Sequence, residues 1–243
     1  MKSIAYQGVP GSFSFLAGLK FFGKKNKFLS SESFNQIFEA VTKKYADYGI
    51  IPIENSIAGP VYENYDLLTK YNVKVIGEIY LKIEHHLLGI RSKIHPKYRL
   101  SLLKKVYSHP KALEQCSKFF NRYPNLEKIS FKDTAGAAKF VAESNDITLG
   151  AIASKESARL YKLQILTANI EDYKNNYTRF LILTHPKNYH PQQTANKCSL
   201  IFLLPHRPGS LYNALEIFAK NKINLTKIES RPIPPVSYTH LRA

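Results

Sequence analysis

Cysteine and long apolar runs are both scarce in this chain, and each scarcity excludes a class of protein. Only two of the 243 residues are cysteines, Cys116 and Cys198, too few for a disulfide-stapled secreted domain, so we expect buried thiols. No run approaches about 18 uncharged apolar residues, so neither a membrane span nor a membrane partner is predicted. Met1 to Ala5 enter a strand pattern directly and lack the apolar run of a signal peptide, so the cytoplasm is the expected location.

Acidic residues are also few. The chain has 18 Asp and Glu against 35 Lys and Arg, a net charge of +17, and such a charge raises the question of nucleic-acid binding. The lysines are dispersed, however, and no helix-turn-helix, zinc-finger or RNP pattern accompanies them. We expect no specific nucleic-acid partner, although a salt-titrated binding assay would expose one. The positive field would instead speed the capture of a small dianion.

Histidine and cysteine show no metal-ligand spacing. His85 and His86 are adjacent, and neighbouring residues of a strand point to opposite faces, so these two rings cannot chelate one ion together. The sequence therefore predicts no metal site.

Apolar periodicity predicts an α/β protein. Strand patterns alternate with helix patterns through about residue 185, which predicts helices packed on mostly parallel sheets. Ser12, Ser33 and Asp133 stand where helix N-caps are expected. Leu113, Cys116 and Phe120 give one helix an apolar stripe. Apolar and polar residues alternate from Glu78 to Ile90, which indicates the crossover into a second lobe. Residues 154–161 predict a helix that returns the chain to the first lobe.

The pattern changes after residue 185. Residues 186–196 are polar and contain Pro186 and Pro191, which predicts a linker. Beyond it, residues 198–204 predict a strand, Pro208-Gly209-Ser210 opens a helix, and residues 224–230 predict a second strand.

The segment Asn176-Tyr177-Thr178-Arg179-Phe180 places a hydroxyl and a guanidinium at the start of an apolar strand. Thr178 offers a neutral hydrogen-bond donor, and Arg179 offers a planar fork that fits a carboxylate. We expect both to face a cleft and to bind an acidic substrate. The alternative is a strand start whose Arg forms a structural ion pair.

Two further strands end in polar side chains. Residues 49–56 end in Glu54, Asn55 and Ser56, and residues 106–110 end in Ser108, His109 and Pro110. Open α/β sheets bind ligands at the carboxyl ends of their strands. Both segments are therefore expected at one cleft.

These segments, in this order and spacing, resemble the prephenate dehydratase family. The supporting motifs are Tyr6-Gln7-Gly8, Pro52 to Ser56, His85-His86, Ser108-His109-Pro110, Gln115-Cys116, Thr178-Arg179-Phe180 and Glu229-Ser230-Arg231-Pro232. The resemblance covers about the first 233 residues. It implies a two-lobed, periplasmic-binding-protein-like catalytic domain with mixed sheets at 1–185. Its first lobe would hold about 1–78 plus 159–185, and its second about 79–158.

The resemblance also implies the chemistry. Prephenate would lose its ring hydroxyl and carbon dioxide to give phenylpyruvate, in a carbon–oxygen lyase reaction that needs no metal or organic cofactor. Thr178 would contact the leaving hydroxyl and Arg179 a carboxylate. The remaining residues expected to bind substrate are Asn55, Ser56, Ser108, Gln115 and Phe180.

Residues 197–233 resemble the start of an ACT domain, the ferredoxin-like phenylalanine-sensing module of this family. The implied effector-binding residues are Gly209, Ser210, Leu211, Glu229 and Ser230. An ACT domain continues with two more strands and a helix, whereas residues 234–243 match nothing expected there. We therefore expect a truncated module, an atypical tail, activity without normal phenylalanine inhibition and a tendency to aggregate. A homo-oligomer is in doubt for the same reason.

Two other functions stay open. Arogenate, which carries an ammonium where prephenate carries a keto group, could be the substrate. A non-catalytic protein that binds small anions could share the two-lobed fold, although such proteins lack the Thr-Arg-Phe strand.

Overall fold

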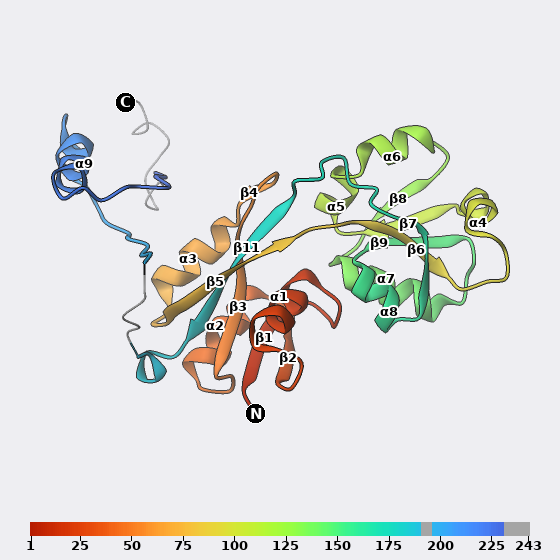
Figure 1. The fold of residues 1–243 in the computed structure, drawn as a ribbon, viewed down its shortest axis with the longest axis horizontal. Coiled ribbons are helices and arrows are strands. Elements are labelled where there is room, and N and C mark those ends of the chain that lie inside the picture. Colours follow the sequence, from red (N-terminus) through yellow and green to blue (C-terminus); the bar gives the residue numbers. More distant parts are fainter. Residues whose placement is uncertain (191–195, 231–243) are drawn as a thin grey trace. The chain divides into compact units, whose positions relative to one another are not determined.

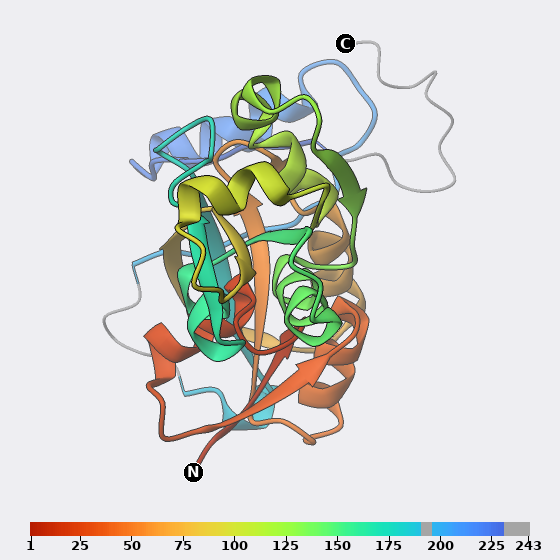
Figure 2. The same ribbon diagram turned by 90° about the vertical axis from the view of Figure 1, so that its right-hand side faces the viewer.

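The computed structural model describes residues 1–190 and 196–230, and it divides the chain into one unit up to His190 and a second from Pro191. The first unit holds two lobes, each built on its own mixed sheet (Figure 1). In Figure 2 the second lobe faces the viewer, with the first lobe behind it. This architecture confirms the expected two-lobed α/β fold.

The sheet of the first lobe has the strand order β2-β1-β3-β11-β5. β1 is parallel to β2 and β3, whereas β11 is antiparallel to both β3 and β5. A short strand, β4, pairs with β3. The strands are β1 (Ser3–Gln7), β2 (Lys27–Ser31), β3 (Tyr48–Asn55), β4 (Gly59–Pro60), β5 (Lys74–Lys82) and β11 (Tyr177–Thr184).

Three helices cover the two faces of this sheet: α1 (Phe13–Phe22), α2 (Phe34–Thr42) and α3 (Tyr62–Lys70). Ser12 and Ser33 cap the first two as expected, because their hydroxyls accept from the amides of Phe15 and Gln36 at 3.3 and 3.4 Å. The face under α1 buries Ile4, Ala17, Ile50, Phe180 and Ile182. The face under α2 and α3 buries Ile37, Phe38, Ile51, Ile53, Leu67, Leu181 and Leu183.

The sheet of the second lobe has the strand order β10-β6-β9-β7-β8. Its strands are β6 (His86–Ile90), β7 (Lys105–Ser108), β8 (Glu127–Ser130), β9 (Leu149–Ala153) and β10 (Leu163–Thr167). Its helices are α4 (Pro96–Leu102), α5 (Pro110–Glu114), α6 (Ser117–Arg122), α7 (Thr134–Ser144) and α8 (Lys155–Leu160). Asp133 caps α7 as expected, because its carboxylate accepts from the Gly136 amide at 2.7 Å.

The lobe boundaries differ from the expected ones. β5 continues to Lys82 in the first sheet, so the chain crosses at residues 83–85. β10 pairs with β6, so the chain returns only at residues 168–176 and not through α8. The reason is packing, since Leu163 and Ile165 of β10 belong to the apolar cluster beneath α7.

The helix expected after Ser108 is also divided. It stops at Glu114 and restarts at Ser117, where the Asp172 carboxylate accepts from the amides of Ser117 and Lys118 at 3.0 and 2.9 Å. Those amides would otherwise lack acceptors at a helix start. The segment that returns to the first lobe thus stabilises the interruption beside Gln115.

Part of the second unit departs from expectation. The expected helix forms as α9 (Ser210–Lys220), and Gly209 precedes it with φ 81, which favours glycine. Residues 198–204 and 224–230, expected as strands, are not strands in the structure. An isolated strand pair is marginal in water without further strands or a packing partner, and Leu200, Ile201 and Leu203 are correspondingly exposed.

Other expectations for this region stay open. Residues 191–195 of the expected linker, residues 231–233 and the tail at 234–243 lie outside the described residues. Pro186–Asn188 forms a short 3₁₀ helix. Across the described ranges, no helix combines the length and the apolar character that crossing a membrane requires.

The tight packing of α2 on β3 generates a prediction. A methyl group on Gly49 would meet Ile37 Cγ2 at 2.7 Å and Val41 Cγ2 at 3.0 Å. Gly49→Ala should therefore lower the free energy of unfolding by about 1–3 kcal/mol through overpacking. Gly77→Ala is the matched control, because its methyl would meet only the ring of Phe21 at 3.2 Å, and that side chain is 40% exposed and able to move. Equal losses in chemical denaturation would contradict the packing argument.

Candidate functional site

The site begins where β3 ends and β11 begins. Asn55 and Thr178 are paired in the ladder between these strands. The Asn55 side-chain oxygen accepts from the backbone amides of Ile57 and Ala58 at 3.0 and 2.8 Å. Its Nδ2 must therefore point the other way, and it donates to Thr178 Oγ1 at 2.9 Å. The Thr178 oxygen is thus an acceptor, and its own proton has no acceptor among the described residues.

The same Asn55 amide also reaches the segment that returns from the second lobe. Its Nδ2 donates to Asn176 Oδ1 at 2.7 Å. Asn176 is fully buried, and its Nδ2 donates to Gln115 Oε1 at 3.0 Å. Gln115 belongs to the second lobe, so this polar network joins the two lobes through Asn55, Asn176 and Gln115.

His85, on the outgoing crossover, completes the network. Its Nε2 lies 3.0 Å from Gln115 Oε1, and because that oxygen can only accept, Nε2 carries the proton. Nδ1 is then an unprotonated acceptor, and it is buried without a hydrogen-bond partner in the described part of the chain. Burial lowers the pKa of His85, so the ring is held neutral. The ring of Phe13 packs edge-on against it at 5.7 Å.

Arg179 lies on the opposite face of the strand from Thr178. Phe180 and Ile182 pack beneath α1, so alternation places Thr178 on that face and Arg179 on the other. The Arg179 guanidinium lies 3.7 Å from the Glu78 carboxylate. Burial works to lower the pKa of Arg179, but hydrogen bonding to Tyr80 and the charge of Glu78 raise it. The hydroxyl and the guanidinium thus point to opposite faces of β11, and the guanidinium forms the ion pair of the alternative interpretation. Binding of a substrate carboxylate by Arg179 stays a prediction.

Three other expected site residues lie outside the network. The Ser56 hydroxyl donates to Asn175 O at 3.1 Å and accepts from Tyr177 N at 2.9 Å, which clamps the backbone before β11. The Ser108 hydroxyl is buried and donates to Ile152 O at 2.7 Å within the second sheet. Phe180 is 1% exposed and packs in the core. Each of the three therefore has a structural contact in this fold, and their binding of substrate stays a prediction.

Two residues that the sequence interpretation did not count as site residues are central to the network. Asn176 precedes Thr178 by two positions and so shares its face of the strand, a signal that could have identified it. His85 was expected only to point away from its neighbour. No group of three His, Cys, Asp or Glu side chains within residues 1–190 and 196–230 is arranged to hold a metal ion.

The lobes also meet at the turn between β1 and α1. The hydroxyls of Ser154 and Ser157 both donate to Gly11 O, at 2.9 and 3.0 Å, and Tyr161 donates to Pro10 O at 2.7 Å. Gly11 has φ 93, and a methyl group there would lie 2.7 Å from Ser157 Oγ. Only glycine fits here. This contact joins the two lobes beside the end of β1.

Comparisons with known proteins agree with the two-lobed fold and identify the family. The family model described as prephenate dehydratase matches residues 4–188. The chain is 42% identical over 243 residues to the prephenate dehydratase of Methanocaldococcus jannaschii, covering 95% of this chain and 83% of that protein. The crystal structure of a prephenate dehydratase in complex with L-Phe from Arthrobacter aurescens is similar, with a TM-score of 0.81 and 25% identity over 95% of this chain and 76% of that chain.

A plant relative carries two activities in its name. The chain is 42% identical over 229 residues to the arogenate dehydratase/prephenate dehydratase 1 of Arabidopsis thaliana, covering 94% of this chain and 57% of that protein. The chain thus spans less than two thirds of the length of the plant relatives that it matches.

The neutral state of His85 generates a prediction on pH. Its folded pKa is depressed, so the unfolded chain takes up the proton first, and stability is lost as pH falls below about 6.5. His85→Gln keeps an N–H for Gln115 and should flatten this loss, which for one proton is at most about 1.4 kcal/mol per pH unit. Denaturation between pH 5 and 7.5 measures it, with the exposed His190→Gln as control. Burial also lowers the pKa of His86 and His109, which leaves a residual slope. An unchanged slope in His85→Gln would contradict the assignment.

Proposed function

The chain belongs to the prephenate dehydratase family, and from that premise we propose that it converts prephenate to phenylpyruvate. Prephenate has two carboxylates and a ring hydroxyl. Loss of one carboxylate as carbon dioxide supplies the electrons that expel the hydroxyl, and a proton from solvent completes its departure as water. The reaction is a carbon–oxygen lyase reaction driven by formation of the aromatic ring. The chemistry itself calls for neither a metal ion nor an organic cofactor.

The observation that carries the proposal is the hydrogen-bond polarity at Thr178. Asn55 occupies the acceptor side of the hydroxyl, so its proton is directed to a further acceptor. In the proposed reaction that acceptor is the departing ring oxygen. A threonine hydroxyl is a weak acid, so Thr178 donates a hydrogen bond to the leaving group and does not surrender its proton outright.

The two lobes contribute different parts. Asn55 and Thr178 come from the first lobe, and Gln115 comes from the second. Because Asn176 bonds to both Asn55 and Gln115, the relative position of the lobes and the orientation of the Thr178 hydroxyl are coupled. We propose that Ser56 and Ser108 hold the backbone around the substrate and that Phe180 supports Thr178 from the core.

Arogenate is the second candidate substrate, because one relative's name includes both activities. It differs from prephenate in the side chain, where an ammonium replaces the keto group. Turnover of both compounds by the same preparation decides between them. Turnover of neither, with retained binding of either, would establish a non-catalytic anion-binding protein.

We also propose that residues 197–230 contribute to an ACT-type effector site. The solved relative contains L-Phe, and the resemblance assigns Gly209, Ser210, Leu211, Glu229 and Ser230 to such a site. Gly209 has the positive φ that a tight turn before a helix requires. Calorimetric titration with L-phenylalanine tests this proposal, and absence of binding would remove it. Tight binding together with inhibition would instead contradict the expected loss of normal phenylalanine inhibition.

Thr178→Ala should lower kcat for prephenate by about 10²–10³, because one transition-state hydrogen bond is lost from a preorganised site. Thr178→Ser is the matched variant, since it keeps the hydroxyl and should retain most of the activity. Asn55 Nδ2 keeps its bonds to Asn176 Oδ1 and Tyr177 O in both variants, so the fold should survive. If the Ala variant keeps more than about a third of the wild-type rate, the role of Thr178 is wrong.

Arg179→Lys separates two roles for the guanidinium. Because Arg179 pairs with Glu78 and Tyr80, the variant should lower the free energy of unfolding by about 1 kcal/mol through loss of the planar fork. KM for prephenate should stay within about two-fold of wild type, since this face lies opposite Thr178. A tenfold rise in KM without loss of stability would instead place the guanidinium on a substrate carboxylate.

A further inference from the structure

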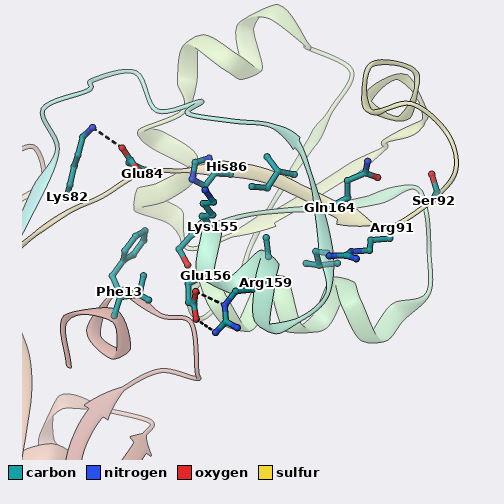
Figure 3. Close-up of a pocket in the computed structure, with 15 residues that line it drawn as sticks. Phe13, Lys82, Glu84, His86, Arg91, Ser92, Lys155, Glu156, Arg159 and Gln164 are labelled. Carbon is teal, nitrogen blue, oxygen red and sulfur yellow. Dashed lines mark hydrogen bonds and ion pairs between the residues drawn. The ribbon is translucent and has the colours of Figure 1, made fainter. Parts of the chain in front are cut away.

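A pocket of about 810 Å³ lies beside the crossover between the lobes (Figure 3). Phe13 and Leu16 of α1 line it from the first lobe, and residues of α8 and β10 line it from the second. The end of β5 contributes Lys82, the crossover contributes Glu84, and the start of β6 contributes His86. Thr178, Asn55, Asn176 and Gln115 are not among its lining residues. The pocket is therefore distinct from the proposed site, and no role assigned above uses it.

His86 gives this pocket a fixed hydrogen-bond donor. Its ring is 5% exposed, and its Nδ1 accepts from the backbone amide of Asn169 at 3.1 Å. In the neutral ring the proton is therefore on Nε2. Nε2 has no hydrogen-bond partner among the described residues. Burial lowers the pKa of His86, against the opposing charges of Glu171 and Glu84 and with a smaller contribution from Lys155, so the neutral ring is favoured and donates from that single position.

Lys155 gives the pocket a positive charge that no direct ion pair holds among the described residues. The Glu84 carboxylate, whose pKa is lowered mainly by its hydrogen bond with Lys82, is near enough for the Lys155 charge to lower that pKa further. Figure 3 shows its side chain extending toward His86. The neighbouring charges are already paired, because Lys82 bonds to Glu84 at 2.8 Å and Arg159 bonds to Glu156. Lys155 and Arg91 form no ion pair within the part of the chain that the structure describes. The lining therefore favours an anion.

Besides His86, the uncharged part of the lining has three polar residues, Ser92, Ser154 and Gln164, and an apolar wall. Phe13, Leu16, Leu163 and Ile165 belong to it, and Figure 3 shows the Phe13 ring across the pocket from His86. A cation beside a fixed N–H suits a carboxylate, and an apolar wall suits a hydrocarbon group. We propose that the pocket binds a small carboxylate that carries an apolar group, with its carboxylate at His86 Nε2 and Lys155 and its apolar part against Phe13.

Binding there has a structural consequence. The proposed ligand contacts Phe13 of the first lobe and Lys155 of the second, so it stabilises the arrangement of the lobes seen in this structure. His85, the neighbour of His86, belongs to the network that orients Thr178. The pocket is thereby a second ligand site beside the segment that holds His85 and His86. Its occupancy does not depend on the proposed reaction.

Nuclear magnetic resonance of the chain labelled with ¹⁵N-histidine tests the proposal at the site itself. The chain has 8 histidines, and His86→Gln identifies the resonance of His86. Phenylacetate is the probe, with acetate as the probe without an apolar group and phenethylamine as the probe of opposite charge. Phenylacetate should shift the His86 resonance saturably and bind at least about tenfold more tightly than acetate, because burying a ring is worth more than that. Phenethylamine should not compete.

Two charge-matched variants and one site variant complete the experiment. Lys155→Gln should weaken phenylacetate at least about tenfold, whereas Lys187→Gln, which removes an exposed lysine outside the pocket, should not. Thr178→Ala should leave the titration unchanged, which separates this pocket from the proposed active site. An unshifted His86 resonance, equal binding of acetate, an unchanged affinity in Lys155→Gln, or loss of binding in Thr178→Ala would each overturn the proposal.

Discussion

The arrangement of the site depends on one local interaction, the acceptance of the Ile57 and Ala58 amides by the Asn55 side-chain oxygen. This turn fixes which end of the Asn55 amide is the donor. The donor and acceptor of each further hydrogen bond in the network follow from this orientation, because each amide side chain has one donating and one accepting end. Toward Thr178 it leaves a hydroxyl proton directed outward. Toward Asn176, the Asn55 amide donates to Asn176 Oδ1, so Asn176 Nδ2 donates to Gln115 Oε1. The same Gln115 oxygen accepts from Nε2 of the neutral His85.

The network therefore joins the two lobes and, in the proposed reaction, also orients the Thr178 hydroxyl. Asn176 is fully buried and bonds to residues of both lobes, so separating the lobes would leave polar groups without partners at substantial cost. The interrupted helix beside Gln115, capped by Asp172, is what brings this amide to the boundary. In the proposed reaction, such a network would hold the Thr178 hydroxyl in place before substrate arrives, and preorganised donors of this kind give catalytic hydrogen bonds their strength.

Two neighbouring histidines, His85 on the crossover and His86 at the start of β6, have different hydrogen-bond partners. His85 donates from Nε2 within the network and is covered by Phe13, while His86 receives an amide on Nδ1 and lines the pocket. Alternation along an extended chain separates them. One strand therefore connects the proposed active site with the proposed carboxylate pocket, and Phe13 contributes to both.

The sequence by itself determined the local features. Helix caps at Ser12, Ser33 and Asp133, the alternation of strands and helices and the order of the polar strand ends follow from residue type and spacing, which act over a few positions, whereas the two-lobed plan was implied by the family resemblance. Tertiary structure alone decided the rest. Arg179 meets Glu78 because β5 pairs with β11, about 100 residues away in sequence, and β10 joins the second sheet because its apolar face fits beneath α7. Residues 198–204 have strand character, but the residues that the structure describes offer them no partner strand, and they form no strand. Spacing cannot reveal such outcomes, since they depend on which distant segment supplies the partner.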